Sequence, residues 1–201
     1  MLKKIIGGVG DFLQIADSAI KEKEIKVYSH AHCADEFFSG LGVSADITFF
    51  NKIEDLNGIE DAPDLQRDLF GSFEVPEAST LRANQLLGGR PYVVGIHPVG
   101  GDFWNAHTRE RGISIQKVIP PEQVKAIVGL FSEKTTIALF GSPNQLEDYK
   151  PILTQKNIVY IEHANIWDSL ANVSFCHRLI AVDSGIKSMA AYKRIPSIVF
   201  V

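Results

Sequence analysis

The amino-acid sequence predicts an α/β fold with mostly parallel sheets. From residue 92 to the end of the chain, short apolar runs of strand length alternate with amphipathic stretches of helix length. A weaker version of the same alternation covers residues 2–50. Small and polar residues stand where the predicted strands end, and in a parallel sheet these ends share one edge, where ligands bind.

The first half of the chain has a clear pattern that then weakens. Strands and helices alternate, beginning with a strand, at 2–6, 11–20, 26–29, 34–41 and 46–50. A glycine-rich turn, GGVG, follows the first strand. Residues 51–88 show no firm period except for a helix expected at 76–87. The Gly88-Gly89 pair, followed by Arg90-Pro91, is the best hinge, so we expect domains at 1–88 and 89–201.

The second half has the more regular pattern. Strands are expected at 92–97, 135–140, 158–161, 178–182 and 197–201, and helices at 121–131, 145–155, 166–175 and 186–192. The loops that leave the first four strands at their carboxyl ends contain residues 97–101, 141–143, 162–163 and 183–185. These four loops should therefore face one rim of the sheet.

Composition excludes several classes of function. The 201 residues are 45% hydrophobic and 22% charged, enough for one good core or two small ones. A net charge of −4 argues against a surface that binds duplex nucleic acid. No apolar run approaches the roughly 20 residues of a membrane-spanning helix. Cys33 and Cys176 lie far apart without metal-ligand spacing, and no secretory signal is evident, so we expect a cytoplasmic protein.

The tripeptide Asp183-Ser184-Gly185 separates a predicted strand from a predicted helix. Residues of this kind at a helix start expose backbone N–H groups and a hydroxyl, which suits a phosphate or a sugar. Asp and Ser are also common helix caps, and the tripeptide alone favours that simpler interpretation.

Five segments distributed over most of the chain resemble motifs of a known family. In order they are GGVGDFLQIADSAI, GIHPVGGDFWN, QKVIPPEQ, IALFGSPNQLED and LIAVDSGIKSMAAYKRIPSIVFV. Together they resemble motifs of glycosyltransferase family 9, the ADP-heptose:lipopolysaccharide heptosyltransferases. The resemblance implies a GT-B-like fold, in which two Rossmann-like domains with parallel sheets face each other across a cleft. The N-terminal domain would be reduced and the C-terminal end truncated, as in a short or truncated member.

The resemblance also implies a chemistry. Such enzymes invert the configuration of a sugar that they move from a nucleotide-sugar, here ADP-linked, to a glycan or lipopolysaccharide-type acceptor. The first domain would bind the acceptor and the second the donor, with no metal or other cofactor. A glycolipid acceptor would bring the cytoplasmic protein to the inner face of the membrane. No nucleic-acid partner is implied.

Individual positions acquire roles through the same resemblance. Asp11 matches the aspartate that acts as base on the acceptor hydroxyl, although it could instead cap the first helix. Lys117 matches a lysine at the diphosphate, although it could be a solvated surface residue. Gly8 and Gly10 would form the acceptor-side loop. The remaining donor-binding candidates are Gly141, Ser142, Asp183, Ser184, Gly185 and Lys187.

The chain departs from the family pattern at several positions. Ser188 stands where the family has histidine, and Ser184 where it has threonine, so the sugar preference stays open. Arg109 and Arg111 have no family counterpart, and we interpret them as solvated loop charges.

Two other functions remain open. His30 and His32 form a His-x-His motif at the end of a predicted strand, which resembles the metal-binding start of amidohydrolase barrels. Against a hydrolase, 201 residues supply too few strand–helix units for such a barrel. The chain could also be a module that binds a nucleotide-sugar without transferring it.

Overall fold

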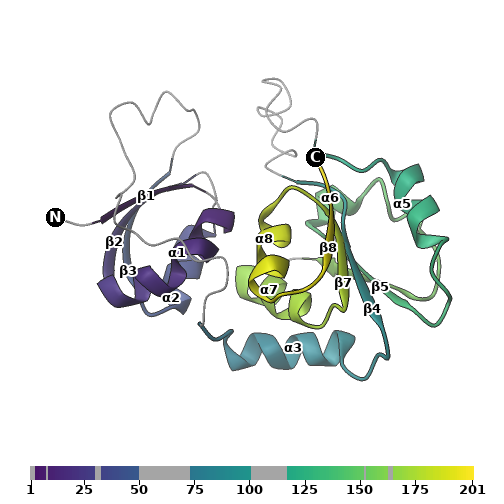
Figure 1. Ribbon diagram of the computed structural model, residues 1–201, viewed down its shortest axis with the longest axis horizontal. Coiled ribbons are helices and arrows are strands. Elements are labelled where there is room, and N and C mark those ends of the chain that lie inside the picture. The colour runs from purple at the N-terminus through teal and green to yellow at the C-terminus, as the bar shows by residue number, and fades with distance from the viewer. Residues whose placement is uncertain are drawn as a thin grey trace.

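The computed structural model describes residues 3–7, 9–29, 33–49, 73–100, 117–151, 153–162 and 165–201. These residues form two parallel sheets with helices packed beside them, as the sequence predicts (Figure 1). Five of the residues considered from the sequence lie outside the described residues: His30, His32, Arg109, Arg111 and Gly8.

The first sheet has three strands in the order β1-β2-β3, all parallel. They are β1 (Lys3–Gly7), β2 (Glu24–Ser29) and β3 (Ser44–Phe49). The connections contain α1 (Val9–Glu22) and α2 (Ala34–Gly40). Alternate residues of β2 are buried, so the strand packs one face against the core, where it meets apolar side chains of α1 and α2.

The second sheet has five parallel strands in the order β6-β5-β4-β7-β8. In chain order they are β4 (Val93–His97), β5 (Thr136–Gly141), β6 (Ile158–Glu162), β7 (Arg178–Val182) and β8 (Ser197–Phe200). Every residue of β4 and β5 is buried, which is typical of a parallel sheet that is covered on both faces.

Two layers of helices cover this second sheet. One core contains α5 (Pro121–Val128) and α6 (Pro143–Leu146) with one set of alternate strand residues, and the other contains α7 (Ile166–Ser174) and α8 (Gly185–Tyr192) with the opposite set. Strand order reverses at β4, because β5 and β6 extend the sheet on one side and β7 and β8 on the other. The carboxyl ends of β4 and β7 therefore flank the topological switch point.

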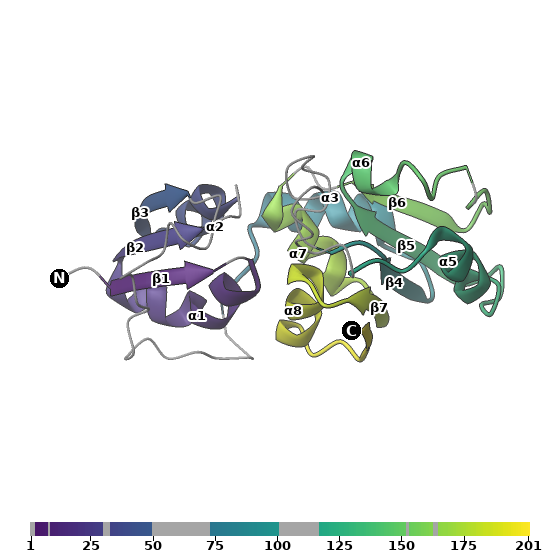
Figure 2. The same cartoon turned by 90° about the horizontal axis from the view of Figure 1, so that it is seen from above.

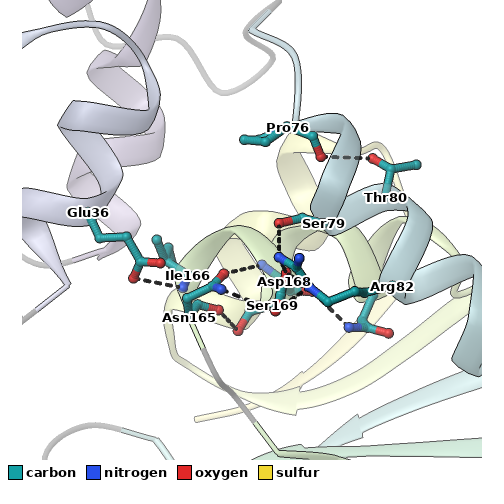
Figure 3. Close-up of polar contacts among 10 residues, drawn as sticks. Glu36, Pro76, Ser79, Thr80, Arg82, Asn165, Ile166, Asp168 and Ser169 are labelled. Atoms are coloured by element: carbon teal, nitrogen blue, oxygen red, sulfur yellow. Dashed lines mark hydrogen bonds and ion pairs between the residues drawn. The ribbon is translucent and has the colours of Figure 1, made fainter.

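Helix α3 (Glu77–Leu87) packs against α7, although it precedes the predicted hinge (Figure 1). Arg82 of α3 donates from Nε to both carboxylate oxygens of Asp168 on α7, at 3.0 and 3.1 Å (Figure 3). Its Nη2 also donates to Ser79 Oγ. The domain boundary at 88/89 stays a prediction, with α3 in contact with the part of the chain that follows it.

A single hydrophobic core joins the two sheets, because helices α1 and α2 pack on α8 and α7 (Figures 1 and 2). Phe37 of α2 stacks on Trp167 of α7, with ring centroids 5.3 Å apart and an interplanar angle of 5°. The indole Nε1 of Trp167 donates to the carbonyl oxygen of Glu36 at 3.1 Å. The Glu36 carboxylate in turn accepts from the N–H of Ile166, where a negative charge interacts favourably with the start of α7 (Figure 3).

One sequence prediction of secondary structure is wrong. The helix expected at 145–155 is the short α6, followed by turns. Ser142 and Gln145 form a capping box at its start, so the helix begins earlier than predicted. Pro151 prevents a long helix here, because a proline in a helix interior removes a hydrogen bond and clashes with the preceding turn. Within the described residues, no helix is long and apolar enough to cross a membrane.

The aromatic contact between the sheets should carry much of the stability. We expect Trp167→Ala to lower the free energy of unfolding by about 3–5 kcal/mol, because it opens a cavity in the shared core. Urea denaturation measures this, and unfolding should stay a single transition because both sheets share that core. Leu81→Ala, at a side chain 55% exposed on α3, is the control and should change stability by no more than about 0.5 kcal/mol. Two separate transitions in the wild-type protein would contradict a shared core.

Candidate functional site

The switch point between β4 and β7 gathers most of the predicted donor-side residues. His97 ends β4 and Val182 ends β7, and the two strands pair in register through His97 and Ala181. The Asp183-Ser184-Gly185 segment therefore leaves β7 next to the loop that leaves β4. This juxtaposition depends on strand order, which the sequence pattern alone does not specify.

Three charged side chains form an ion-pair cluster at this edge. Lys117 Nζ lies 3.1 Å from Asp183 Oδ2, and Lys187 Nζ lies 2.8 Å from Asp183 Oδ1. Hydrogen bonds from Lys187 and then from Lys117 hold the pKa of Asp183 below its ordinary value. Lys117, whose predicted alternative is a solvated surface residue, is thus paired and half-exposed. Two ammonium groups and one carboxylate leave one net positive charge at this position.

A short antiparallel contact brings Lys117 to the switch point. Val99 and Val118 form an isolated bridge, the N–H of Gly100 donates to the carbonyl of Lys117 at 3.0 Å, and that of Ile119 donates to the carbonyl of Pro98. The buried hydroxyl of Tyr149 donates to the Ile119 carbonyl at 2.7 Å and so helps to fix the position of residues 117–119.

Gly100 allows the two loops to touch. A Cβ at this position would lie 2.9 Å from Val182 Cγ2, 3.1 Å from the carbonyl oxygen of Asp183 and 3.4 Å from Ser184 Cβ. A larger residue would therefore push the loop after β4 away from the loop after β7. The sequence motif that contains Gly100 did not predict this close contact, because residues 182–184 are more than 80 positions away along the chain.

Ser184 is the N-cap of α8 and also the partner of a buried histidine. Its Oγ accepts from the backbone N–H of Lys187 at 3.5 Å, and it lies 2.9 Å from Nδ1 of His97, a side chain only 5% exposed. The capping interpretation of the tripeptide is thus confirmed for Ser184. The sequence places His97 in the loop 97–101 at the rim of the sheet but assigns it no role of its own. Its position at the end of a buried strand was the available signal.

The remaining predicted donor residues lie on the other side of β4. Gly141 ends β5, and a Cβ there would lie 2.9 Å from the Leu146 side chain, so glycine allows α6 to pack closely. Ser142 caps α6, accepting from the N–H of Gln145 at 3.3 Å, while its own N–H donates to Gln145 Oε1 at 2.9 Å. Both residues therefore lie at the carboxyl end of β5, the strand next to β4, and so at the same edge of the sheet as residues 183–185.

The start of α1 faces the start of α8, which brings the predicted acceptor side close to the donor side. A Cβ at Gly10 would lie 2.9 Å from Ser188 Oγ, in the first turns of the two helices. Asp11 follows directly and lies in the first turn of α1. Because α1 begins at Val9, the alternative that Asp11 is the N-cap is wrong. Ser188, where the family has histidine, is small enough for this close approach.

The described residues give no support to a metal site. Among them, no group of three or more His, Cys, Asp or Glu side chains is placed to hold a metal ion. The carboxylate of Glu36, which follows the His-x-His motif in the sequence, contacts the start of α7. His30 and His32 themselves are outside the described ranges.

The fold is similar to solved glycosyltransferases. One is a family 9 glycosyl transferase from Veillonella parvula, with a TM-score of 0.58 and 13% identity over 98% of this chain and 80% of that chain. Another is ADP-heptose lipopolysaccharide heptosyltransferase II of E. coli, with a TM-score of 0.62 and 14% identity over 98% and 84% of the two chains. At these identities the likeness concerns the fold. No family model and no curated protein matches the sequence.

The ion-pair cluster should make stability depend on pH. Since the pKa of Asp183 is lower in the folded than in the unfolded chain, its contribution is present above the unfolded value of 3.8 and is lost as pH falls through the folded value. We therefore expect Asp183→Asn to destabilise the protein at about pH 7, and the difference from wild type to shrink as the pH falls below 3.8 and the Asp183 carboxylate becomes protonated. Urea denaturation across this pH range measures it. A difference independent of pH would contradict the pairing.

Proposed function

We propose that this protein is a glycosyltransferase that moves a heptose or a related sugar from a nucleotide-sugar donor to a glycan or lipopolysaccharide-type acceptor. The observation that carries the proposal is the pair of lysines at the switch point of a fold that glycosyltransferases also have. The transfer inverts the configuration at the sugar and needs no metal or other cofactor.

The donor is an ADP-linked sugar whose diphosphate binds between Lys117 and Lys187. Support comes from the charge of the two ammonium groups and from the partial positive charge at the start of α8, which begins at Gly185. A neighbour in fold is named for ADP-heptose, which favours ADP as the nucleoside diphosphate. Gly141 and Ser142 extend the same edge toward the nucleoside, and Ser184 contributes its hydroxyl to the phosphate.

The transfer is a single displacement in which Asp11 is the general base. The Asp11 carboxylate takes the proton of an acceptor hydroxyl as that oxygen forms its bond to the anomeric carbon. The bond between the anomeric carbon and the phosphate oxygen breaks, and its electron pair leaves with the nucleoside diphosphate. Lys117 and Lys187 compensate the negative charge that develops on this leaving group. The approach of α1 to α8 at Gly10 and Ser188 supports this division of roles.

The acceptor lies on the side of the first sheet, at the glycine-rich segment of the sequence that contains Gly8 and Gly10; Gly10, predicted to lie in a loop, is in the first turn of α1. A glycolipid acceptor would place a cytoplasmic enzyme at the inner face of the membrane. The second candidate is a module that binds the nucleotide-sugar without transfer. It has the same donor residues and differs from the enzyme in having no chemistry at Asp11.

Removal of the Lys117 ammonium should weaken nucleotide binding. We expect Lys117→Ala to raise the dissociation constant for ADP by about 10- to 100-fold, the usual effect of losing a hydrogen bond to a charged group. Isothermal calorimetry measures it, with Lys125→Ala on the exposed side of α5 as a control of equal charge change. Equal ADP affinity in wild type and Lys117→Ala would show that Lys117 does not contact the nucleotide and is a solvated surface residue.

Replacement of Asp11 should separate the enzyme from the binding module. Asp11→Asn keeps the shape of the side chain and removes the base, so turnover with an ADP-sugar should fall by about 10²- to 10⁴-fold while ADP affinity stays unchanged. Rates measured by release of ADP test this. Retained activity would exclude Asp11 as the base.

Two results with the wild-type protein would favour the other candidates. Donor binding without any transfer would indicate the binding module. Stoichiometric zinc in the purified protein, together with activity abolished by EDTA, would favour the His-x-His hydrolase.

A further inference from the structure

The pair formed by His97 and Ser184 connects the two strands of the switch point through their side chains. We propose that His97 is a positioning residue, whose Nδ1–H donates to Ser184 Oγ and thereby directs the Ser184 hydroxyl hydrogen at a phosphate oxygen of the bound nucleotide. The phosphate contact rests on the proposed function. The hydrogen bond between the two side chains is a property of the protein without ligand.

The inventory of donors and acceptors at Ser184 supports this direction. A serine hydroxyl has one hydrogen to donate and two lone pairs that accept. One lone pair accepts from the backbone N–H of Lys187, and the other faces Nδ1 of His97 at 2.9 Å. If the ring donates, both lone pairs are occupied and the hydroxyl hydrogen is available to a ligand. If the ring accepts, the hydrogen is consumed inside the protein.

An anionic ligand favours the first arrangement. A hydroxyl that already accepts two hydrogen bonds is polarised, and its own hydrogen bond to a charged oxygen is strengthened. Lys117 and Lys187 provide the positive charge that would hold a phosphate at this edge.

The ring of His97 is held by packing. Its side chain is 5% exposed at the end of a fully buried strand, and Gly100 lets the loop after β4 rest against the carbonyl of Asp183 and the Cβ of Ser184. The serine of the N-cap is thus oriented from two sides, by α8 through Lys187 and by β4 through His97. The capping serine Ser142, by comparison, accepts a hydrogen bond from its own helix, at the N–H of Gln145.

The tautomer of His97 can be measured in the protein without ligand. In ¹⁵N–¹H correlation spectra of the histidine rings at neutral pH, we expect a protonated Nδ1 for His97, assigned by its loss in His97→Asn. His177 is an internal reference of the opposite kind, because its Nδ1 accepts from the N–H of Val93 at 3.1 Å and must be unprotonated. An unprotonated Nδ1 at His97 would overturn the inference.

A double-mutant cycle tests the contact with phosphate. Calorimetry with ADP should show that His97→Phe and Ser184→Ala each weaken binding by about 10-fold or more, and that the double variant is no weaker than Ser184→Ala alone, because both changes remove the same hydrogen bond. His97→Asn, whose amide N–H can take the place of the ring Nδ1–H, should restore affinity to within about 3-fold of wild type. His177→Phe, just before β7 and in contact with Val93 at the start of β4, is the control and should leave ADP affinity unchanged.

The outcomes separate this inference from the proposed function. Losses that add in the double variant, or full affinity in a folded His97→Phe variant, would overturn the positioning role while ADP binding by the wild type still supports the proposed function. Failure of the wild-type protein to bind ADP would overturn the proposed function and, with it, the phosphate contact of Ser184.

Discussion

The stack of Phe37 on Trp167 is the contact on which the arrangement of the candidate site depends. Through this stack, α2 beside the first sheet packs against α7 beside the second within one hydrophobic core. Hydrogen bonds from Trp167 and Ile166 to Glu36 orient the same contact. The neighbouring pair α1 and α8 is thereby brought together at its first turns. Residues that would act on acceptor and donor come to face each other because the helices behind them share a core.

Electrostatics at the switch point follow from this packing. Asp183 compensates two lysines that arrive from different directions, Lys187 from the first turn of α8 and Lys117 from a segment that pairs with residues 98–100. Without such a carboxylate the two ammonium groups would repel each other at close range. With it they stay together, carry a net positive charge and remain exposed enough to meet an anion.

Much of the fold could be predicted from local patterns. The alternation of apolar runs and amphipathic stretches indicated the strands of both sheets, and the caps at Ser142 and Ser184 follow from residue type. The order of the strands could not be predicted, because it depends on pairing between distant segments. For the same reason the sequence placed residues 97–101 at the rim of the sheet without indicating that His97 and Gly100 contact residues 182–184, more than 80 positions along the chain. The apolar period of residues 145–155 predicts a longer helix than α6 because the period does not register Pro151, which a helix interior does not accommodate.

In the proposed function, an anionic nucleotide binds at the carboxyl ends of β4 and β7. Backbone amide hydrogen exchange with and without ADP tests it most directly, because bound ligand slows exchange where it contacts or orders the backbone. We expect slower exchange concentrated at residues 98–100 and 183–187, with the core of α1 and α2 unchanged. Slowing confined to other segments, or none at saturating ADP, would contradict it.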